Sequence, residues 1–432
     1  MQGLFQFVKS NFRWLAGGLL LTVFSSFGQT FYISLFSKQI RETFDLTDGN
    51  FGTIYMVATL ASAVSLIWVG KLVDRYPVSK VAFVVMLFLA LACVGMSMVS
   101  SVAMLLVVIY ALRLFGQGMM THTSQTAMGR WYSAERGRAI SLTAMGHQVG
   151  EAILPSLVLF LMLDSVALDD PGVLIEAANS QGTGGLNLGW RKIWQLAAIA
   201  VIVALPVVML LMRVERQPQK VEVDQADANK LAARDWTRAE VLRDPAFWGL
   251  CVGILAPAFI GTSVFFHSIH LTEIKGWSPQ VFASSFLVLS ITTVMSTLVA
   301  GWLVDRFNSK RLLPTFLLPM AIGCLLLGTF SATWVIFAFM FLLGLSYGLS
   351  SSVFGTIWPE TYGTKHLGSI RSVAISAMVF ASALGPGLTG RAIDWEIGFE
   401  FQLILMAAYS FGAAALMVFV SRNLLSRTET ST

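Results

Sequence analysis

Residues 70–75 read Gly-Lys-Leu-Val-Asp-Arg, and residues 301–306 read Gly-Trp-Leu-Val-Asp-Arg, 231 positions later. The same offset relates further landmarks, namely Phe51 to Phe282, Gly137 to Gly368 and Pro155 to Pro386. A second pair of polar and aromatic segments, Gly28–Tyr32 and Gly261–Phe265, lies close to this offset. The chain is therefore predicted to consist of two copies of one structural unit.

The composition predicts a protein that crosses a membrane many times. Of its 432 residues 56% are apolar and only 12% are charged, whereas soluble proteins have about a quarter charged residues. A helix needs about 20 apolar residues to cross a bilayer. Twelve such spans are predicted: 14–37, 51–70, 81–99, 102–129, 137–163, 193–212, 245–270, 280–303, 311–330, 333–358, 367–391 and 400–421.

The basic residues predict the orientation of these spans. Of the 29 lysines and arginines, 22 fall on the side of the N-terminus, six on the opposite side, and Arg113 inside a span. Cytoplasmic loops carry the excess of positive charge. The protein is thus expected in the cell membrane, with both termini in the cytoplasm. The apolar run after Arg13 is expected to be a first helix that is retained in the protein.

The fold class expected is an all-α membrane protein of twelve helices, arranged as two six-helix bundles related by a pseudo-two-fold axis. The predicted domains are 1–212, a cytosolic linker 213–244, and 245–432. The outward-facing stretch 164–192 is rich in Gly, Asn and Ser near its end and is expected to be irregular. Parallel repeats of this kind are typical of transporters, whose site lies at mid-membrane between the halves.

Several other functions are disfavoured by the residues. The net charge of +5 is spread over many short loops, unlike the basic patch of a nucleic-acid-binding protein. Cys93, Cys251 and Cys324 lie in apolar runs without metal-ligand spacing. There is no phosphate-binding G-x-x-x-x-G-K-[ST] sequence and no catalytic constellation, so neither an enzyme, nor a metal, nor a cofactor is expected.

At these motifs the chain resembles the major facilitator superfamily. Gly70, Asp74 and Arg75 match its G-x-L-x-D-R-x-G-R-[RK] loop signature, from which Pro77 and Ser79 depart. The second copy, at Gly301, Asp305 and Arg306, is expected in this family, and residues 113–118, Arg-Leu-Phe-Gly-Gln-Gly, resemble its fourth-helix pattern R-x-x-G-x-G. The resemblance implies a conformational latch that joins the bundles on the cytoplasmic side in the outward-open state. It is formed by Gly70, Asp74, Arg75, Gly301, Asp305 and Arg306, for which the alternative is a surface ion pair in each loop.

A closer resemblance is to the monocarboxylate and oxalate/formate porters. Residues 130–132, Arg-Trp-Tyr, precede an Arg-Gly-Arg-Ala step at 136–139, as in the entry to their fifth helix. The acid–arginine pair of the eighth helix in animal monocarboxylate porters is missing, because 280–303 carries no charge. The G-x-x-x-G-P motif of drug–proton antiporters is incomplete: Gly146 and Gly150 are present without the following proline.

Two ionisable residues are predicted at matching depth in neighbouring spans. Arg113 lies eleven residues from the outer end of its span and Glu151 twelve from the outer end of the next, about 17 and 18 Å at about 1.5 Å per residue. Placing either charge alone at that depth costs a free energy on the order of 3 kcal/mol or more. An ion pair between Arg113 and Glu151 would offset much of this free energy. His147 shares a helix face with Glu151. The trio is predicted to bind a carboxylate on Arg113 and a proton on Glu151 or His147; the alternative is a structural pair that locks the two spans.

The rest of the cavity is predicted to be lopsided, with charge in the first half and hydroxyls and aromatics in the second. A kink is expected at Pro257 and Gly261. The predicted substrate-binding or proton-coupling residues are Arg113, Glu151, His147, Gln117, Gln29, Tyr32, His267, Phe286 and Tyr347.

The function predicted is secondary active transport of a small organic anion, monocarboxylate-like and coupled to protons by symport, through alternating access. The expected partners are this anion, the proton and the lipid bilayer, with a monomeric protein and no nucleic acid. The alternatives are proton-driven efflux of amphipathic drugs or metabolites, and a transporter-like membrane sensor.

Overall fold

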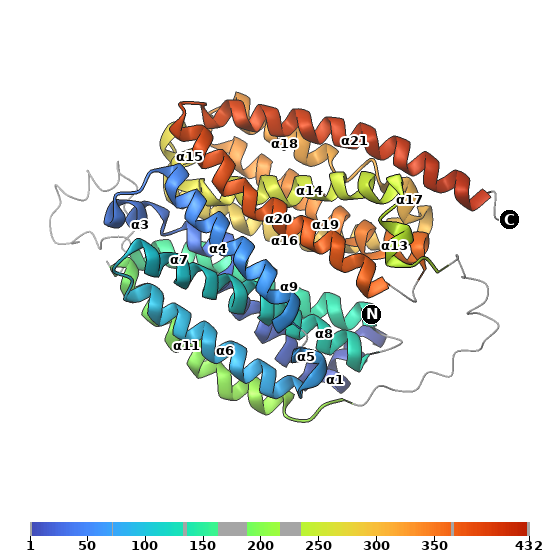
Figure 1. Ribbon diagram of the computed structural model, residues 1–432, viewed down its shortest axis with the longest axis horizontal. Coiled ribbons are helices and arrows are strands. Elements are labelled where there is room, and N and C mark those ends of the chain that lie inside the picture. Colours follow the sequence, from blue (N-terminus) through green and yellow to red (C-terminus); the bar gives the residue numbers. More distant parts are fainter. Residues whose placement is uncertain are drawn as a thin grey trace. The chain divides into compact units, whose positions relative to one another are not determined.

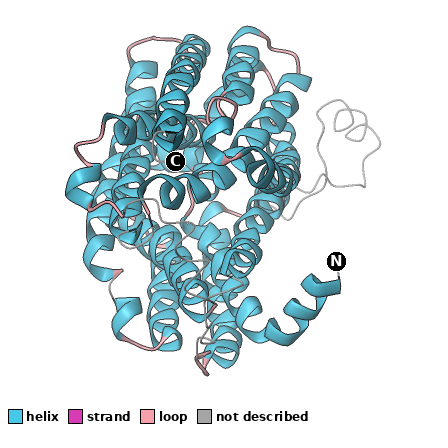
Figure 2. Cartoon of the chain, turned by 90° about the vertical axis from the view of Figure 1, so that its right-hand side faces the viewer, coloured by secondary structure: helices cyan, strands magenta, loops and turns pink. Residues whose placement is uncertain are grey.

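The computed structural model describes residues 2–70, 72–132, 136–162, 188–216, 235–363 and 367–429. Within these ranges the chain is helical and contains no β-strand (Figure 2). Most of the predicted outer loop 164–192 and of the predicted linker 213–244 falls outside the described residues. The part of the linker that is described includes the short helix α13 (Arg238–Val241), which begins with a Thr237–Glu240 capping box.

Ten helices in the described chain are long and apolar enough to cross a membrane, and one bent pair, Gln6–Ser34 with Ser37–Phe44 at 64°, adds an eleventh span. Predicted span nine, 311–330, is correct only in part. It forms the short α17 (Ser309–Leu312) and then α18 (Leu318–Thr329), separated by irregular turns. Pro314 and Pro319 lack the amide hydrogen that a continuous helix needs, which explains the shorter element.

The chain divides into two compact units. Unit 1 comprises Met1–Leu46, Val57–Val221 and Ser278–Phe286, and unit 2 comprises Thr47–Met56, Glu222–Trp277 and Leu287–Thr432. Two helices, α4 (Asp48–Val69) and α16 (Pro279–Phe307), therefore contribute residues to both units. The boundaries predicted from the sequence, 1–212 and 245–432, stay a prediction.

Unit 1 is built on α1, whose neighbours are α8, α9 and α11, while α6 runs beside α11 along most of its length (Figure 1). Its helices are α1 (Gln2–Phe24), η1 (Ser25–Gly28), α2 (Thr30–Ser34), α3 (Ser37–Phe44), α5 (Leu72–Arg75), α6 (Val78–Ser97), α7 (Val102–Ala111), η2 (Leu112–Met120), α8 (Thr121–Trp131), α9 (Arg136–Met162) and α11 (Trp190–Met212).

Unit 2 is built on α14, which packs against α20 and α21 (Figure 1). Helix α18 packs against both α19 and α21. Its helices are α13, α14 (Pro245–Phe266), α15 (Ser268–Lys275), the rest of α16, α17, α18, α19 (Trp334–Tyr362), α20 (Leu367–Asp394) and α21 (Phe399–Glu429).

Large apolar side chains cover the outside of these helices as well as their core. Val203, Leu298 and Phe419 are each about two-thirds exposed. A soluble protein rarely exposes contiguous apolar surface of this kind, whereas hydrocarbon tails solvate it. Backbone groups are satisfied inside each helix, as a membrane interior requires.

Candidate functional site

The first span is broken at its centre. Helix α1 ends at Phe24, the tight turn η1 follows, and Gln29 adopts an extended conformation (φ −83°, ψ 155°) before α2 resumes. A helix that stops inside the membrane leaves carbonyl groups without an intrahelical partner. The carbonyl of Gly28 is thereby available to a side chain from another helix.

That side chain is Arg113, which is 1% exposed. Its Nη1 atom donates hydrogen bonds to the carbonyl oxygen of Gly28, 3.1 Å away, and to Oγ1 of Thr30, 3.3 Å away. Both acceptors lie at the break between α1 and α2. The guanidinium is therefore held inside unit 1 by the interrupted helix, and its depth in the membrane stays a prediction.

The helix that carries Arg113 is also irregular. Between α7 and α8 the residues Leu112–Met120 form a π-helix, η2. Such wide turns are rare and are common at functional sites. Gln117 lies half-buried in this segment, so both predicted residues of this motif lie on the irregular turn.

Close backbone contact brings η1 and η2 together. A Cβ atom on Gly28 would lie 2.2 Å from the carbonyl oxygen of Leu112, and one on Gly116 would lie 2.7 Å from the Cα of Gly28. Only glycine fits at these two positions. Because η1 and η2 lie this close together, the Arg113 side chain can donate to the Gly28 carbonyl.

Helix α9 packs on the same broken span. A Cβ atom on Gly146 would lie 2.2 Å from Oγ1 of Thr22, and one on Gly150 would lie 2.0 Å from Oγ of Ser26. Small residues four positions apart let membrane helices approach closely. The face next to this glycine pair carries His147 and Glu151, so both residues lie near the break.

Glu151 is 4% exposed and forms neither a hydrogen bond nor a salt bridge with the described residues. The expected ion pair between Arg113 and Glu151 is therefore absent, because the backbone carbonyl of Gly28 and Thr30 accept from Arg113 instead. The matching depth predicted for the two residues does not set the direction in which each side chain points.

Aromatic rings form one side of this site. The ring of Phe31 lies 5.9 Å from that of His147 and 6.0 Å from that of Phe286, centroid to centroid. Phe286 belongs to the segment Ser278–Phe286 that clusters with unit 1. Phe31, Thr30 and Gly28 were not among the predicted site residues. The polar run Ser25–Thr30 in an otherwise apolar span is the sequence signal that indicated this region.

Tyr32 and Tyr347 occupy different surroundings. Tyr32 is buried in an aromatic cluster, 5.0 Å from the ring of Phe27 and 5.1 Å from that of Trp194. In unit 2, the hydroxyl of Tyr347 donates to the carbonyl of Pro257 at 3.5 Å and lies directly over Gly261. Tyr347 thus sits on the segment of α14 where the sequence predicted a kink.

His267 lies in unit 2, at the junction of α14 and α15, and is 2% exposed. Its Nε2 atom is 3.2 Å from the carbonyl oxygen of Pro386, and its Nδ1 atom is 3.6 Å from Oδ1 of Asp48. Next to it, Asp394 accepts hydrogen bonds from the Thr47 hydroxyl and the Gly49 amide. These contacts join the start of α4 to α20. Helices α4, α14 and α20 enclose the ring, and a role of His267 in binding substrate or protons stays a prediction.

The latch residues are described in part. The side chains of Asp74 and Asp305 lie outside the described residues. The carbonyl of Gly70 contacts Nε2 of His122 at 3.2 Å, whereas nothing lies within 4 Å of a Cβ placed on Gly301. The guanidinium of Arg306 lies 5.4 Å from the ring centroid of Trp302, and Arg75 is exposed.

Trp131 and Tyr132, at the end of α8, contact Arg216 at the start of the predicted linker. Arg216 donates to the carbonyl of Trp131 at 2.7 Å, and its guanidinium stacks 4.2 Å from the ring of Tyr132. Both aromatic residues are buried. The Arg-Trp-Tyr sequence noted at 130–132 thus has a packing role at this end of unit 1.

Many membrane-spanning helices, an interrupted helix and a buried guanidinium within one unit are typical of membrane transporters. The model of the Major Facilitator Superfamily matches residues 18–386 and 256–430. The chain belongs to this superfamily, and the predicted fold class is confirmed. It is a multi-pass membrane protein.

Relatives of known activity are distant. An oxalate:formate antiporter of Oxalobacter formigenes is 24% identical over 294 residues, which is 67% of this chain and 63% of the relative. A glycerol-3-phosphate transporter of Bacillus subtilis (strain 168) is 25% identical over 208 residues, 45% and 42% of the two chains. The chain therefore spans less than two thirds of the length of these relatives.

Two solved structures share the fold. A bacterial homolog of the human lysosomal transporter Spinster has a TM-score of 0.72 at 16% identity, covering 96% of this chain and 97% of that one. A D-xylose–proton symporter has a TM-score of 0.68 at 16% identity, covering 94% and 97%.

Proposed function

We propose that this transporter moves a small organic anion, of the monocarboxylate kind, together with a proton by alternating access. The observation that carries the proposal is the buried Arg113 at the break of the first span. A guanidinium is the side chain best suited to bind a carboxylate, because its N–H groups match the two oxygens. Burying a charged side chain in a membrane costs free energy, and such residues usually have a function. Gly28 and Thr30 hold this guanidinium inside unit 1.

The remaining residues of the site fit this substrate class. Phe31 and Phe286 offer apolar surface for the carbon part of an anion. Glu151 and His147 are the other ionisable groups predicted at this depth, and protonation changes the charge of either residue by one unit. A proton on Glu151 and an anion on Arg113 leave the net charge of the site unchanged, which is the physical basis proposed for symport.

We propose the rest of the predicted assembly on the same terms. The protein acts as a monomer in the cell membrane with both termini in the cytoplasm, supported by the 22 of 29 basic residues on that side. Gly70, Asp74, Arg75, Gly301, Asp305 and Arg306 are proposed as the latch of one transport state, supported by the repetition of this loop in both halves.

Exchange of two carboxylates is the second candidate, favoured by the oxalate:formate antiporter among the relatives. The two candidates differ in what drives net movement. Symport needs a proton gradient, whereas exchange needs a second anion on the opposite side of the membrane.

Purified protein in liposomes distinguishes them. Labelled formate, lactate and oxalate are offered outside, with the interior alkaline and empty, or pH-neutral and preloaded with unlabelled acid. Symport predicts accumulation in the first arrangement that a protonophore abolishes. Exchange predicts uptake in the second arrangement only.

Glu151→Gln tests the coupling step. Under symport this variant should lose gradient-driven accumulation and keep the exchange of labelled for unlabelled anion. No uptake of any acid in either arrangement, with Arg113→Ala indistinguishable from the unaltered protein, contradicts the proposed function.

A further inference from the structure

A cavity of about 500 Å³ lies at one end of unit 2, separate from the Arg113 site. It is lined by the end of α16, the turn into α17, and the ends of α19 and α21. The lining residues are Val304, Arg306, Phe307, Asn308, Arg311, Thr356, Glu360 and Leu425. Its volume lies in the range of small-molecule pockets, about 300–1,000 Å³.

The charge of this cavity is positive. Arg306 and Arg311 line it, and neither guanidinium forms a hydrogen bond or a salt bridge with the described residues. Among the described lining residues the carboxylate is that of Glu360, which accepts a hydrogen bond from the Ser309 hydroxyl and whose charge acts on the neighbouring Lys310. The two arginines are therefore available for an anion.

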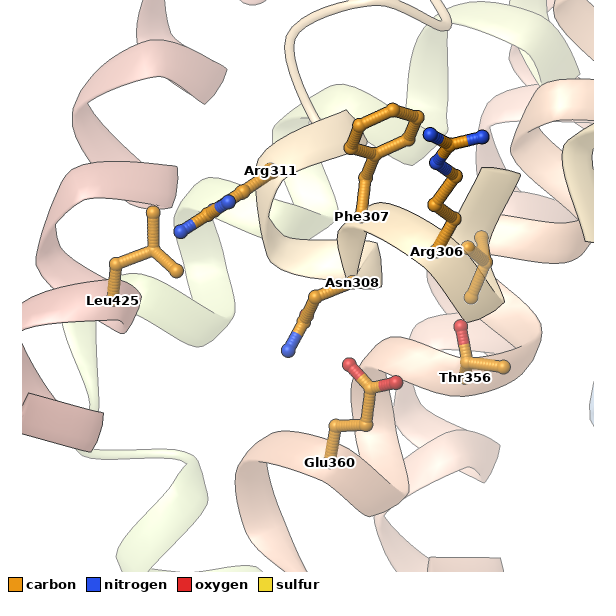
Figure 3. Close-up of a pocket in the computed structure, with 8 residues that line it drawn as sticks. Arg306, Phe307, Asn308, Arg311, Thr356, Glu360 and Leu425 are labelled. Carbon is orange, nitrogen blue, oxygen red and sulfur yellow. The ribbon is translucent and has the colours of Figure 1, made fainter. Parts of the chain in front are cut away.

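The side chains are arranged around the hollow rather than against one another. Arg311 extends toward Leu425 of α21, while Asn308 and Glu360 point toward each other from opposite walls (Figure 3). Arg306 projects from the last turn of α16 beside Phe307 (Figure 3).

The turn between α16 and α17 has an unusual backbone. Asn308 adopts φ 71° and ψ 144°, a conformation that is essentially restricted to glycine. Its Oδ1 atom accepts from the Lys310 amide at 2.9 Å, which holds the turn in place. Strained residues of this kind concentrate at ligand sites, where the surrounding structure enforces them.

The neighbouring aromatic residues place the cavity near lipid headgroups. Phe307, which lines the cavity, is 42% exposed, and Trp302, about one helical turn before Arg306, is 56% exposed. Tryptophan is enriched where a membrane helix meets the headgroup layer. The sequence predicts that this end of the helices faces the cytoplasm, where bilayers carry anionic lipid.

We propose that this cavity is a binding site for a phosphate group, held by Arg306 and Arg311. Arginine recognises phosphate through paired N–H donors, and Asn308 and Thr356 add polar groups at the rim. Val304, Phe307 and Leu425 offer apolar surface beside them. The same chemistry fits the headgroup of an anionic phospholipid and a soluble phosphate, and this inference does not depend on the substrate at Arg113.

Binding is tested on the full-length protein in detergent by native mass spectrometry and by thermal unfolding. Three probes are titrated: a short-chain phosphatidylglycerol, a short-chain phosphatidylcholine and inorganic phosphate. Saturable stabilisation by phosphatidylglycerol, at concentrations at least 10-fold below those of phosphatidylcholine, indicates a lipid headgroup site. Competition by millimolar inorganic phosphate indicates a site for soluble phosphate.

Arg311→Ala should weaken binding of the preferred probe at least 5-fold, and Arg306→Ala with Arg311→Ala should abolish saturation. Arg422→Ala, on an exposed turn of α21 outside the cavity, removes the same charge and should leave binding unchanged. If the double variant fails to fold, Leu425→Glu places a carboxylate in the cavity and should weaken binding in the same way. Equal binding in Arg311→Ala and the unaltered protein, or an equal loss in Arg422→Ala, would overturn the proposal.

Discussion

The Nη1 atom of Arg113 lies 3.1 Å from the carbonyl oxygen of Gly28, at the point where the first membrane span is interrupted. The turn η1 that follows the end of α1 thus supplies the acceptor for a buried guanidinium of a neighbouring helix. A continuous first helix would use that carbonyl in its own hydrogen-bond ladder. The break in α1 and the charge in η2 are therefore parts of one arrangement.

Arg113→Ala is expected to abolish anion transport, and Arg113→Lys to retain only part of it. A hydrogen bond to a charged group contributes about 2–3 kcal/mol, which corresponds to roughly 30- to 150-fold in affinity. Lysine keeps the charge but lacks the paired donors. Initial uptake rates and substrate affinity in liposomes measure this, at matched protein content and with Arg422→Ala as the control. An unchanged rate in Arg113→Ala would assign the residue to structure alone.

Gly28→Ala is expected to destabilise unit 1 and to slow transport. The added Cβ would lie 2.2 Å from the Leu112 carbonyl oxygen, so the contact between η1 and η2 must open. Forcing an extra methyl group into a packed interior costs about 1–3 kcal/mol. Gly412→Ala is the matched control, because nothing lies within 4 Å of its Cβ position. Thermal unfolding in detergent reports the difference, and equal melting temperatures for the two variants would contradict the close contact.

Much of this arrangement was accessible from the sequence because bilayer thickness sets helix length. The predicted span 400–421 lies within α21, and 81–99 overlaps α6 with an offset of a few residues. The helical rise likewise predicts a matching depth for Arg113 and Glu151. Depth, however, does not give rotation about the helix axis, and the expected Arg113–Glu151 ion pair is absent for this reason.

The breaks were less accessible, because long-range contacts produce them. The sequence of Leu112–Met120 contains Arg113, Gln117 and two glycines, but nothing in it predicts a π-helix, whose close contact with Gly28 is a long-range one. The same holds for residues 47–56, which include the start of the second predicted span yet cluster with the second half of the chain. Asp394, 345 residues from Gly49, accepts its amide hydrogen bond.

Asp244 and Arg427 form an ion pair in unit 2, between the start of α14 and the end of α21. Asp244 caps α14 through the Ala246 amide, accepts from the Tyr362 hydroxyl at 3.0 Å, and binds Arg427 through both oxygens at 2.8 and 2.9 Å. Burial alone would raise the pKa of Asp244, but the hydrogen bonds from Arg427, Ala246 and Tyr362 outweigh it and hold the pKa below its usual value.

Asp244→Ala should therefore lower the free energy of unfolding by about 2 kcal/mol, from a lost helix cap of about 1 kcal/mol and a partly exposed ion pair of about 1 kcal/mol. Because the folded-state pKa is depressed, this stabilisation is complete above the unfolded pKa of about 3.9 and is lost as the pH falls through the folded pKa. Unfolding of Asp244→Asn and the unaltered protein between pH 7 and pH 3 should converge toward the acid end. A constant difference over this range would show that the charge of Asp244 contributes nothing.

His147, which is half-buried, and His267, which is buried, are expected to respond differently to substitution by glutamine. His147 touches the ring of Phe31, and its Nδ1 atom has no hydrogen-bond partner among the described residues, so it can serve a substrate or a proton. His267 is enclosed by α4, α14 and α20 and contacts the Pro386 carbonyl. His147→Gln should reduce transport with little change in melting temperature. His267→Gln should lower the free energy of unfolding by about 1–3 kcal/mol and leave the substrate affinity of the folded protein unchanged. Transport and unfolding measured on both variants decide the assignment: reduced affinity in a fully stable His267→Gln would place this residue in the substrate path, as the sequence predicted.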